Sequence, residues 1–276
     1  MAGRVTTNQA CGRALTGWGG SWRVVEGLWT WYRRNWRATV VSSLLQPLLL
    51  LLAFGVGFGR LIDTSAPAVQ ATGGVPYLSY LAPALLAVSA VQTAAFESSY
   101  PILSSFKWRR TYEGIAATPI TPGQLAGGQL IWIALRLAMS GAAYLLVITL
   151  FGAVHGPGVL TALIFAVLCG MAFSAPLVAF AAAQEREGSA FTAVFRFVVL
   201  PMTLFSGTFF PISQLPRVVQ PLAWISPLWH GTELARGAAL DTLQLAPAAG
   251  HLAYLVVVLM VGVQLARWQF QVRLTR

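Results

Sequence analysis

Three charged side chains fall well inside the long apolar runs of this sequence, where their burial would be costly: Glu97, Arg136 and Arg196. A central Arg or Asp costs on the order of 2.5 to 3.5 kcal/mol on insertion scales, so such residues usually face the protein interior or a water-filled path. Glu97 and Arg136 lie at similar distances from the loop that joins their two runs, so we predict that they can pair across neighbouring helices. The pair either fixes helix packing or lines the route of an amphiphilic substrate, and Arg196 can instead extend to the cytoplasmic interface.

A second candidate site is the charged loop between the second and third apolar runs. It begins with Lys107-Trp108-Arg109-Arg110, which contains the only lysine of the sequence, and ends with Thr118-Pro119-Ile120-Thr121-Pro122. Residues 111–117 between these segments predict a short helix that the two prolines stop. Cations beside aromatic residues are typical of an anchor at the cytoplasmic face, whereas a short, stiff helix bounded by prolines would transmit force better than a flexible loop. The residues alone leave both readings open.

Other patterns of catalytic residues are missing from the sequence. A phosphate-binding loop needs a lysine behind a glycine-rich turn, and Lys107 follows no such turn. The histidines, His155, His230 and His251, are far apart and lack the spacing of zinc ligands. We therefore expect no ATP hydrolysis, no metal site and no catalytic residue in this chain.

The composition places these residues in a membrane protein. Hydrophobic residues make up 57% of the sequence and charged residues 9%, with a mean hydropathy of +0.68, whereas about a quarter of a soluble domain is charged. A helix of about 20 apolar residues crosses a hydrocarbon core about 30 Å thick. The candidate runs are residues 38–58, 77–106, 123–151, 159–183, 191–210 and 246–268. We therefore predict an all-α integral membrane fold with six transmembrane helices.

The distribution of arginine predicts the orientation of the chain. The net charge is +10, and most Lys and Arg residues fall on one side if both termini are cytoplasmic. Residues 1–37 combine Trp and Arg and predict an amphipathic helix on the cytoplasmic surface, without a cleavable signal peptide. Residues 38–276 then form the six-helix domain with a short cytoplasmic tail. Within it, residues 211–245 are divided by prolines and predict two short re-entrant helices on the outer side.

Two stretches resemble a known family. Residues 97–124 contain KWRRTYEGIAATPITP at 107–122, and residues 205–237 contain SGTFFPISQLP at 206–216. Together with YLAPALLA at 80–87, they resemble the permease subunits of type-2 ABC exporters, in the branch of nodulation-factor exporter and daunorubicin-resistance permeases. The resemblance covers nearly the whole chain, from the N-terminal surface helix to the last apolar run.

This resemblance implies a half-transporter that dimerises with a second copy or with a related permease. Each permease would dock on a cytoplasmic ABC ATPase subunit, present in two copies, and those subunits would bind ATP and magnesium. Residues 109–117 would form a coupling helix on the ATPase, with the surface helix beside it and the short outer helices over the substrate path. The expected location is the bacterial cytoplasmic membrane, with lipids as partners and no role for nucleic acid.

The resulting functional hypothesis is ATP-driven export of an amphiphilic drug, a lipid or a lipid-linked saccharide, and the sequence does not choose among them. An ion-coupled secondary transporter is the alternative, although Glu97 alone offers little support for it. An enzyme that acts on lipids should gather polar residues at one interface, and the sequence shows no such group. The residues expected to contact the ATPase are Lys107, Arg109, Arg110, Thr111, Tyr112 and Glu113, and the candidates for the substrate path are Glu97, Arg136, Phe205, Phe209 and Phe210.

Overall fold

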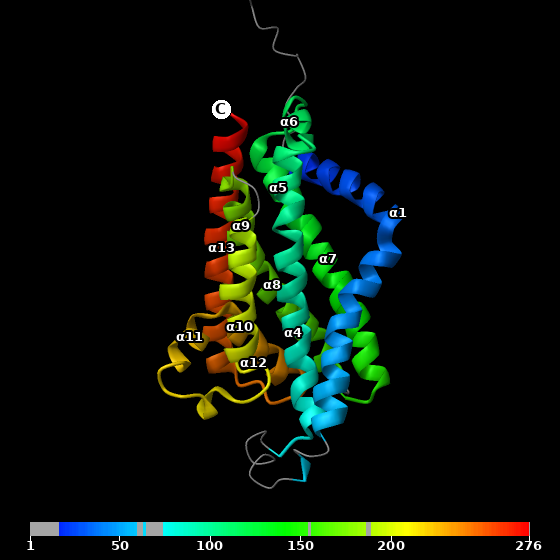
Figure 1. Cartoon of the computed structure of the whole chain (residues 1–276), viewed down its shortest axis with the longest axis vertical. Coiled ribbons are helices and arrows are strands. Elements are labelled where there is room, and N and C mark those ends of the chain that lie inside the picture. The colour runs from blue at the N-terminus through cyan, green and yellow to red at the C-terminus, as the bar shows by residue number, and fades with distance from the viewer. Residues whose placement is uncertain (1–16, 60–62, 65–73, 154–155, 186–188, 276) are drawn as a thin grey trace, which may run out of the picture.

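The computed structural model describes residues 17–59, 63–64, 74–153, 156–185 and 189–275. Every regular element in these ranges is helical, and the helices form an elongated bundle (Figure 1). In chain order they are α1 (Gly19–Leu50), the π-helical η1 (Leu51–Phe58), α4 (Tyr77–Glu97), α5 (Tyr100–Lys107), α6 (Thr111–Ala116), α7 (Pro122–Leu150), α8 (Gly158–Ala183), α9 (Ser189–Val194), the π-helical η2 (Phe195–Val199), α10 (Leu200–Phe205), the 3₁₀ turn η3 (Ile212–Gln214), α11 (Gln220–Ile225), α12 (Pro227–Ala239) and α13 (Leu245–Leu274).

Four helical segments of the described chain are long and apolar enough to cross a membrane. They are Tyr77–Lys107, Pro122–Leu150, Gly158–Ala183 and Leu245–Leu274. These segments coincide with the second, third, fourth and sixth predicted runs to within a few residues, since each run is uniformly apolar over the length a bilayer requires. The chain is therefore an all-helical protein with several membrane-spanning segments.

The first and fifth predicted runs are not among these four segments. Helix α1 continues from the surface segment into the first run, so no helix end marks the predicted boundary between residues 37 and 38. The fifth run is helical only over Ser189–Phe205, whereas the sequence predicted a helix to Phe210. Gly207 has φ +72°, outside the right-handed helical region, and Pro211 disfavours a helical conformation in the residue before it. The count of six spans therefore stays a prediction.

The second span consists of two helices instead of one. Helix α4 ends at Glu97, and α5 follows after a break at Ser98 and Ser99. Pro101 has no amide hydrogen to donate to the carbonyl of Glu97, so the ladder of helical hydrogen bonds cannot continue. The hydroxyl of Ser98 lies 2.7 Å from that of Ser174 in α8, which fixes the break against the middle of the bundle.

Helix α8 is the central helix and contacts α4, α7, α12 and α13. Two glycines allow this close packing. A Cβ atom on Gly170 would lie 3.1 Å from the carbonyl oxygen of Ala90 in α4, and one on Gly262 in α13 would lie 2.7 Å from the backbone nitrogen of Pro176. Small residues at helix contacts bring backbones together in this way in membrane proteins.

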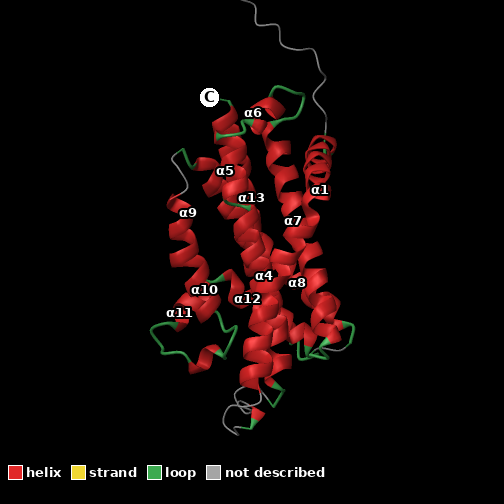
Figure 2. Cartoon of the chain, turned by 45° about the vertical axis from the view of Figure 1, so that its right-hand side comes forward, coloured by secondary structure: helices red, strands yellow, loops and turns green. Residues whose placement is uncertain are grey.

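The segment after α10 folds into three short helical pieces, where the sequence predicted two. Most residues of the last piece, α12, are buried against α4, α8 and α13. Helices α11 and α12 lie at the end of the bundle opposite α6 and the C-terminus (Figure 1). Viewed from a second direction, α9 and α10 form one edge of the bundle and α1 the other (Figure 2). The charged loop and the segment between α10 and α13 are thus separated by the length of the membrane-spanning helices.

Candidate functional site at the two ends of the bundle

The charged loop forms an exposed element at one end of the bundle. Helix α5 ends at Lys107, and Arg110 adopts a left-handed conformation, φ 49°, that turns the chain into α6. Arg109, Arg110, Thr111 and Glu113 are exposed, and Lys107 is half-buried. The Nε atom of Arg110 lies 4.0 Å from a carboxylate oxygen of Glu113, and exposed pairs of this kind contribute little. The cationic groups therefore remain accessible to a partner protein.

Tyr112 holds this exposed element to the bundle. Its side chain is buried, with ring centroids 4.7 Å from Phe106 of α5 and 5.5 Å from Phe270 of α13. Its hydroxyl donates to Oε1 of Gln129 in α7 at 3.1 Å. Burial raises the pKa of the Tyr112 phenol above its ordinary value, so the hydroxyl stays protonated and remains a donor. Sequence reasoning placed Tyr112 in the ATPase contact, but its ring faces the interior and joins α6 to three longer helices.

Helix α1 packs against α7 directly after this element. Thr121 and Gln124 form a capping box at the start of α7, since each side chain accepts a hydrogen bond from the other's backbone, at 3.3 and 3.0 Å. The hydroxyl of Ser21 in α1 donates to the carbonyl oxygen of Gln124 at 2.8 Å. A Cβ atom on Gly128 would lie 2.6 Å from the carbonyl oxygen of Ser21, so the two backbones are in close contact. Helix α1 and the α5–α6 element are therefore connected through the first turns of α7.

Glu97 and Arg136 form the ion pair that their positions predict. The Nε atom of Arg136 donates to Oε1 of Glu97 at 3.0 Å. Arg136 is only 2% exposed, and its guanidinium carbon lies 4.4 Å from the ring centroid of Tyr32 in α1. One cation thus links α1, α4 and α7. Arg196, by contrast, is exposed on η2 and is not part of this pair.

The residues proposed for a substrate path do not come together around one point. Phe205 and Phe210 are partly exposed, at 38% and 36%. Phe209 packs on Phe54 with ring centroids 5.0 Å apart, and its carbonyl oxygen accepts a hydrogen bond from Tyr77 at the first turn of α4. Glu97 stands at the other end of α4, about 30 Å away along a helix that rises about 1.5 Å per residue. The proposed path residues therefore form two groups at different depths.

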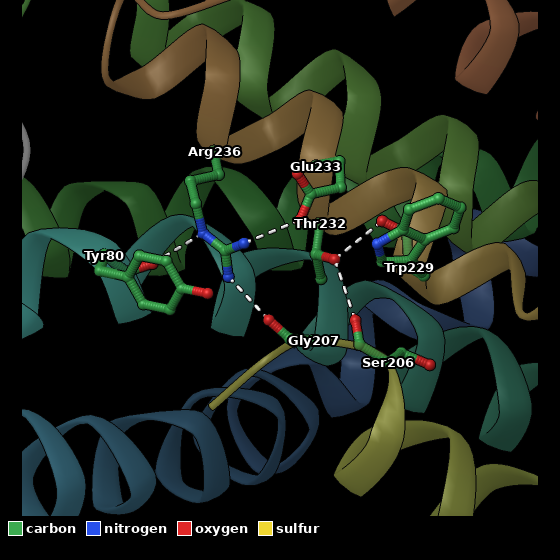
Figure 3. A network of polar contacts seen from close by, with 7 residues as sticks. All are labelled: Tyr80, Ser206, Gly207, Trp229, Thr232, Glu233 and Arg236. Carbon is green, nitrogen blue, oxygen red and sulfur yellow. Dashed lines mark hydrogen bonds and ion pairs between the residues drawn. The ribbon is translucent and has the colours of Figure 1, made fainter. Parts of the chain in front are cut away.

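Arg236 is at the centre of a polar network that sequence reasoning missed (Figure 3). Its Nε atom donates to the carbonyl oxygen of Tyr80 in α4 at 3.3 Å, and Nη2 donates to that of Gly207 at 2.9 Å. Nη1 lies 3.0 Å from Oε1 of Glu233, and the guanidinium carbon lies 3.8 Å from the Tyr80 ring centroid. Next to it, the hydroxyl of Thr232 donates to a carbonyl on each side.

This network fixes the segment between α10 and α13 in place. A buried guanidinium is tolerated when its donors find acceptors, and hydrogen bonds from a charged donor are stronger than neutral ones. Arg236 connects α12 to the second span and to the chain that follows α10. In the sequence, Arg236 is simply one of the arginines that the charge distribution predicts to lie on the outer side. The three-residue spacing from Glu233, in a segment rich in apolar residues, is the one signal that could have identified it.

Two of the histidines also meet, although they are far apart in the sequence. The Nδ1 atoms of His230 and His251 lie 2.7 Å apart, and Nε2 of His230 lies 2.9 Å from the carbonyl oxygen of Trp224. A carbonyl only accepts, so His230 donates through Nε2 and receives a hydrogen bond at Nδ1 from His251. Within the described residues, no group of three His, Cys, Asp or Glu side chains could hold a metal ion. His155 lies outside those residues.

Comparison with known proteins identifies the family. Residues 22–240 match the family described as "ABC-2 type transporter". The chain belongs to this family. Nodulation protein J of Sinorhizobium fredii is 33% identical over 223 residues, covering 77% of this chain and 82% of the relative. Nodulation protein J of Rhizobium meliloti is 30% identical over 219 residues, covering 75% and 80%. That of Rhizobium leguminosarum biovar trifolii is 32% identical over 213 residues, covering 74% and 78%.

The region that matches the ABC-2 family contains most of the candidate sites. It includes the α5–α6 element, the Glu97–Arg136 pair and the Arg236 network, whereas α13 lies beyond it. The resemblance to exporter permeases that was identified from residues 97–124 and 205–237 is thereby confirmed. The chain is a membrane permease of the ABC-2 transporter type.

Proposed function

We propose that this ABC-2 permease is the transmembrane subunit of an ATP-driven exporter that moves an amphiphilic compound out of the cell. A separate cytoplasmic ATPase, in two copies, would bind ATP and magnesium and supply the energy. Two permease chains, identical or related, would form the path. The complex would lie in the bacterial cytoplasmic membrane, in contact with its lipids and with both permease termini inside.

The arrangement of Tyr112 relative to Arg109 and Arg110 is the observation that supports this proposal most directly. The two arginines are exposed, while Tyr112, two residues later, is buried among side chains of α5, α7 and α13. A partner that binds the exposed residues of α6 and of the turn before it therefore contacts an element that Tyr112 attaches rigidly to three helices. Movement of that partner would be passed to the bundle through Tyr112, while Lys107, Thr111 and Glu113 would complete the contact surface.

The substrate is proposed to be a drug, a lipid or a lipid-linked saccharide. The relatives are named nodulation protein J, and export is what the resemblance to the nodulation-factor exporter branch implies. Glu97, Arg136, Phe205, Phe209 and Phe210 remain the candidates for the path. A secondary transporter would need a carboxylate free to exchange protons, and Glu97 is instead paired with Arg136. The ATP-driven mechanism is therefore the better supported one.

Reversing the charge at Arg109 and Arg110 tests this proposal. The complex with its ATPase should be reconstituted in liposomes, with Arg109→Glu/Arg110→Glu compared with Arg217→Glu, which changes an exposed arginine of the segment between α10 and α11. We expect the double variant to insert normally and to lose most of the permease-dependent ATPase activity and transport, while Arg217→Glu retains both. Unchanged turnover in the double variant would remove these arginines from the contact. Transport by the permease without any ATPase would contradict the proposal itself.

A further inference from the structure

A groove opens beside the start of α1 at the same end of the bundle as α6. It has a volume of about 560 Å³ and lies between the first turns of α1, the first turns of α7 and the last turns of α13. None of the residues assigned to the ATPase contact or to the substrate path lines it. The groove is therefore a separate feature of the permease.

The walls of the groove change from apolar to polar along its length. On α13, Val263, Arg267 and Gln271 all line it, and residues four apart share one face of a helix. These positions cover about 12 Å along the helix axis. Leu130 and Ile131 of α7 also line the groove. Leu130 and Ile131 lie further from the N-terminus of α7 than the other groove residues of that helix. In the same way, Val263 lies further from the C-terminus of α13 than Arg267 and Gln271. The apolar part is therefore deeper in the bundle, and the cationic and amide groups are nearer its end.

This gradient matches the edge of a bilayer. The hydrocarbon core is about 30 Å thick and the bilayer with its headgroups about 40 to 45 Å, which leaves several ångströms of interface on each side. Trp18 at the rim of the groove is 78% exposed, and Trp22 on the next turn is 54% exposed. Tryptophan is enriched at this interface. The mouth of the groove is thus placed at the level of the lipid headgroups.

We infer that this groove binds one anionic phospholipid, with its phosphate at Arg267 and its acyl chain along Val263, Leu130 and Ile131. Charge complementarity selects this occupant. Arg267 is exposed, and the ion pairs found among the described residues do not include it. An amphiphile with a negative group between its polar and apolar parts satisfies both the cation and the apolar wall. The inference requires only that the chain lies in a membrane, and it does not depend on ATPase coupling.

Two variants test the site, one by removing its charge and one by filling its volume. Arg267→Gln removes the charge and keeps a polar side chain. Gly123→Trp fills the groove, because Gly123 lines it and a Cβ atom there meets nothing within 4 Å. Arg34→Gln is the matched control, since Arg34 is an exposed cation of α1 that does not line the groove.

The measurement is native mass spectrometry of the purified permease–ATPase complex after incubation with phosphatidylglycerol or with phosphatidylcholine. We expect Arg267→Gln to lower the apparent affinity for phosphatidylglycerol at least about tenfold, the size of a lost charge-assisted hydrogen bond, and to lower that for phosphatidylcholine much less, because its choline cation offsets the charge of the same phosphate. Gly123→Trp should weaken both lipids, and Arg34→Gln should change neither by more than about twofold. Wild-type affinity in Arg267→Gln, or an equal loss in Arg34→Gln, would overturn the inference. If Arg267→Gln instead released the ATPase with lipid binding intact, the groove would be a protein contact.

Discussion

Replacement of Glu97 by Gln should destabilise the permease more than removal of both charges. The side chain of Arg136 is 3% exposed, so Glu97→Gln leaves a buried cation without its counter-charge. Breaking a buried pair in this way costs about 3 to 5 kcal/mol. The ring of Tyr32, 4.4 Å from the guanidinium, contacts it in both proteins, so the cation keeps one favourable neighbour and the loss should lie at the lower end of this range. The expected net loss is about 3 kcal/mol, or more than a hundredfold in the unfolding equilibrium.

The companion variants make this prediction specific. Arg136→Met leaves the carboxylate of Glu97, whose side chain is 20% exposed and can keep part of its hydration, so the loss should be smaller. The double variant Glu97→Leu/Arg136→Met removes both buried charges, and such replacements are often close to neutral. The order of stability should therefore be wild type and double variant first, Arg136→Met next and Glu97→Gln last.

The assay is reversible unfolding of the purified permease by sodium dodecyl sulfate in mixed micelles, followed by tryptophan fluorescence. Trp132 is a suitable reporter, because its ring lies 5.6 Å from that of Tyr32, next to Arg136. Arg196→Met, which changes an exposed arginine, serves as the control. If the free energy of unfolding of the double variant fell by the sum of the two single losses, the reasoning would be refuted. Transport by a stable double variant would in turn assign the pair to packing and exclude it from the substrate path.

Two further variants test other contacts. Arg236→Lys should loosen the segment between α10 and α13, because an ammonium group cannot reach the carbonyl oxygens of Tyr80 and Gly207 with the same planar geometry. Faster proteolysis of residues 212–226 with an unchanged bundle is the expected result, and wild-type protection would contradict it. Gly128→Leu should separate α1 from α7, since its Cβ atom would lie 2.6 Å from the carbonyl oxygen of Ser21. Weaker crosslinking between cysteines placed on the two helices measures this change, while equal crosslinking would count against the close contact.

The long helices and the buried ion pair could be predicted because their signals are local and strong. Runs of about 20 apolar residues have few alternatives to a helix in a membrane. The pairing of Glu97 with Arg136 followed from similar depth in neighbouring antiparallel helices, and the structure places their charged atoms 3.0 Å apart.

The missed features depend on contacts between distant segments. Arg236 looks like one outer charge until the fold brings the carbonyl groups of Tyr80 and Gly207 to it. Tyr112 stands in a helix of six residues, which is too short for a reliable apolar period, so its inward direction could not be inferred. The early end of the fifth span depends on the backbone conformation at Gly207, and glycine is compatible with both helix and turn.

The interruption between α4 and α5 also determines how a displacement can spread. A helix with a gap in its backbone hydrogen bonds bends more easily than an intact one. Helix α4 is held at its far end by Arg236 and beside the gap by Glu97 and Arg136, whereas α5 packs against α6, α8 and α13. A force applied at Arg109 would therefore act on α5, α7 and α13 together through Tyr112, and the second span would bend at Ser98 more easily than within α4. The gap thus divides this span into a long segment fixed by two buried arginines and a short segment that follows the helices around Tyr112.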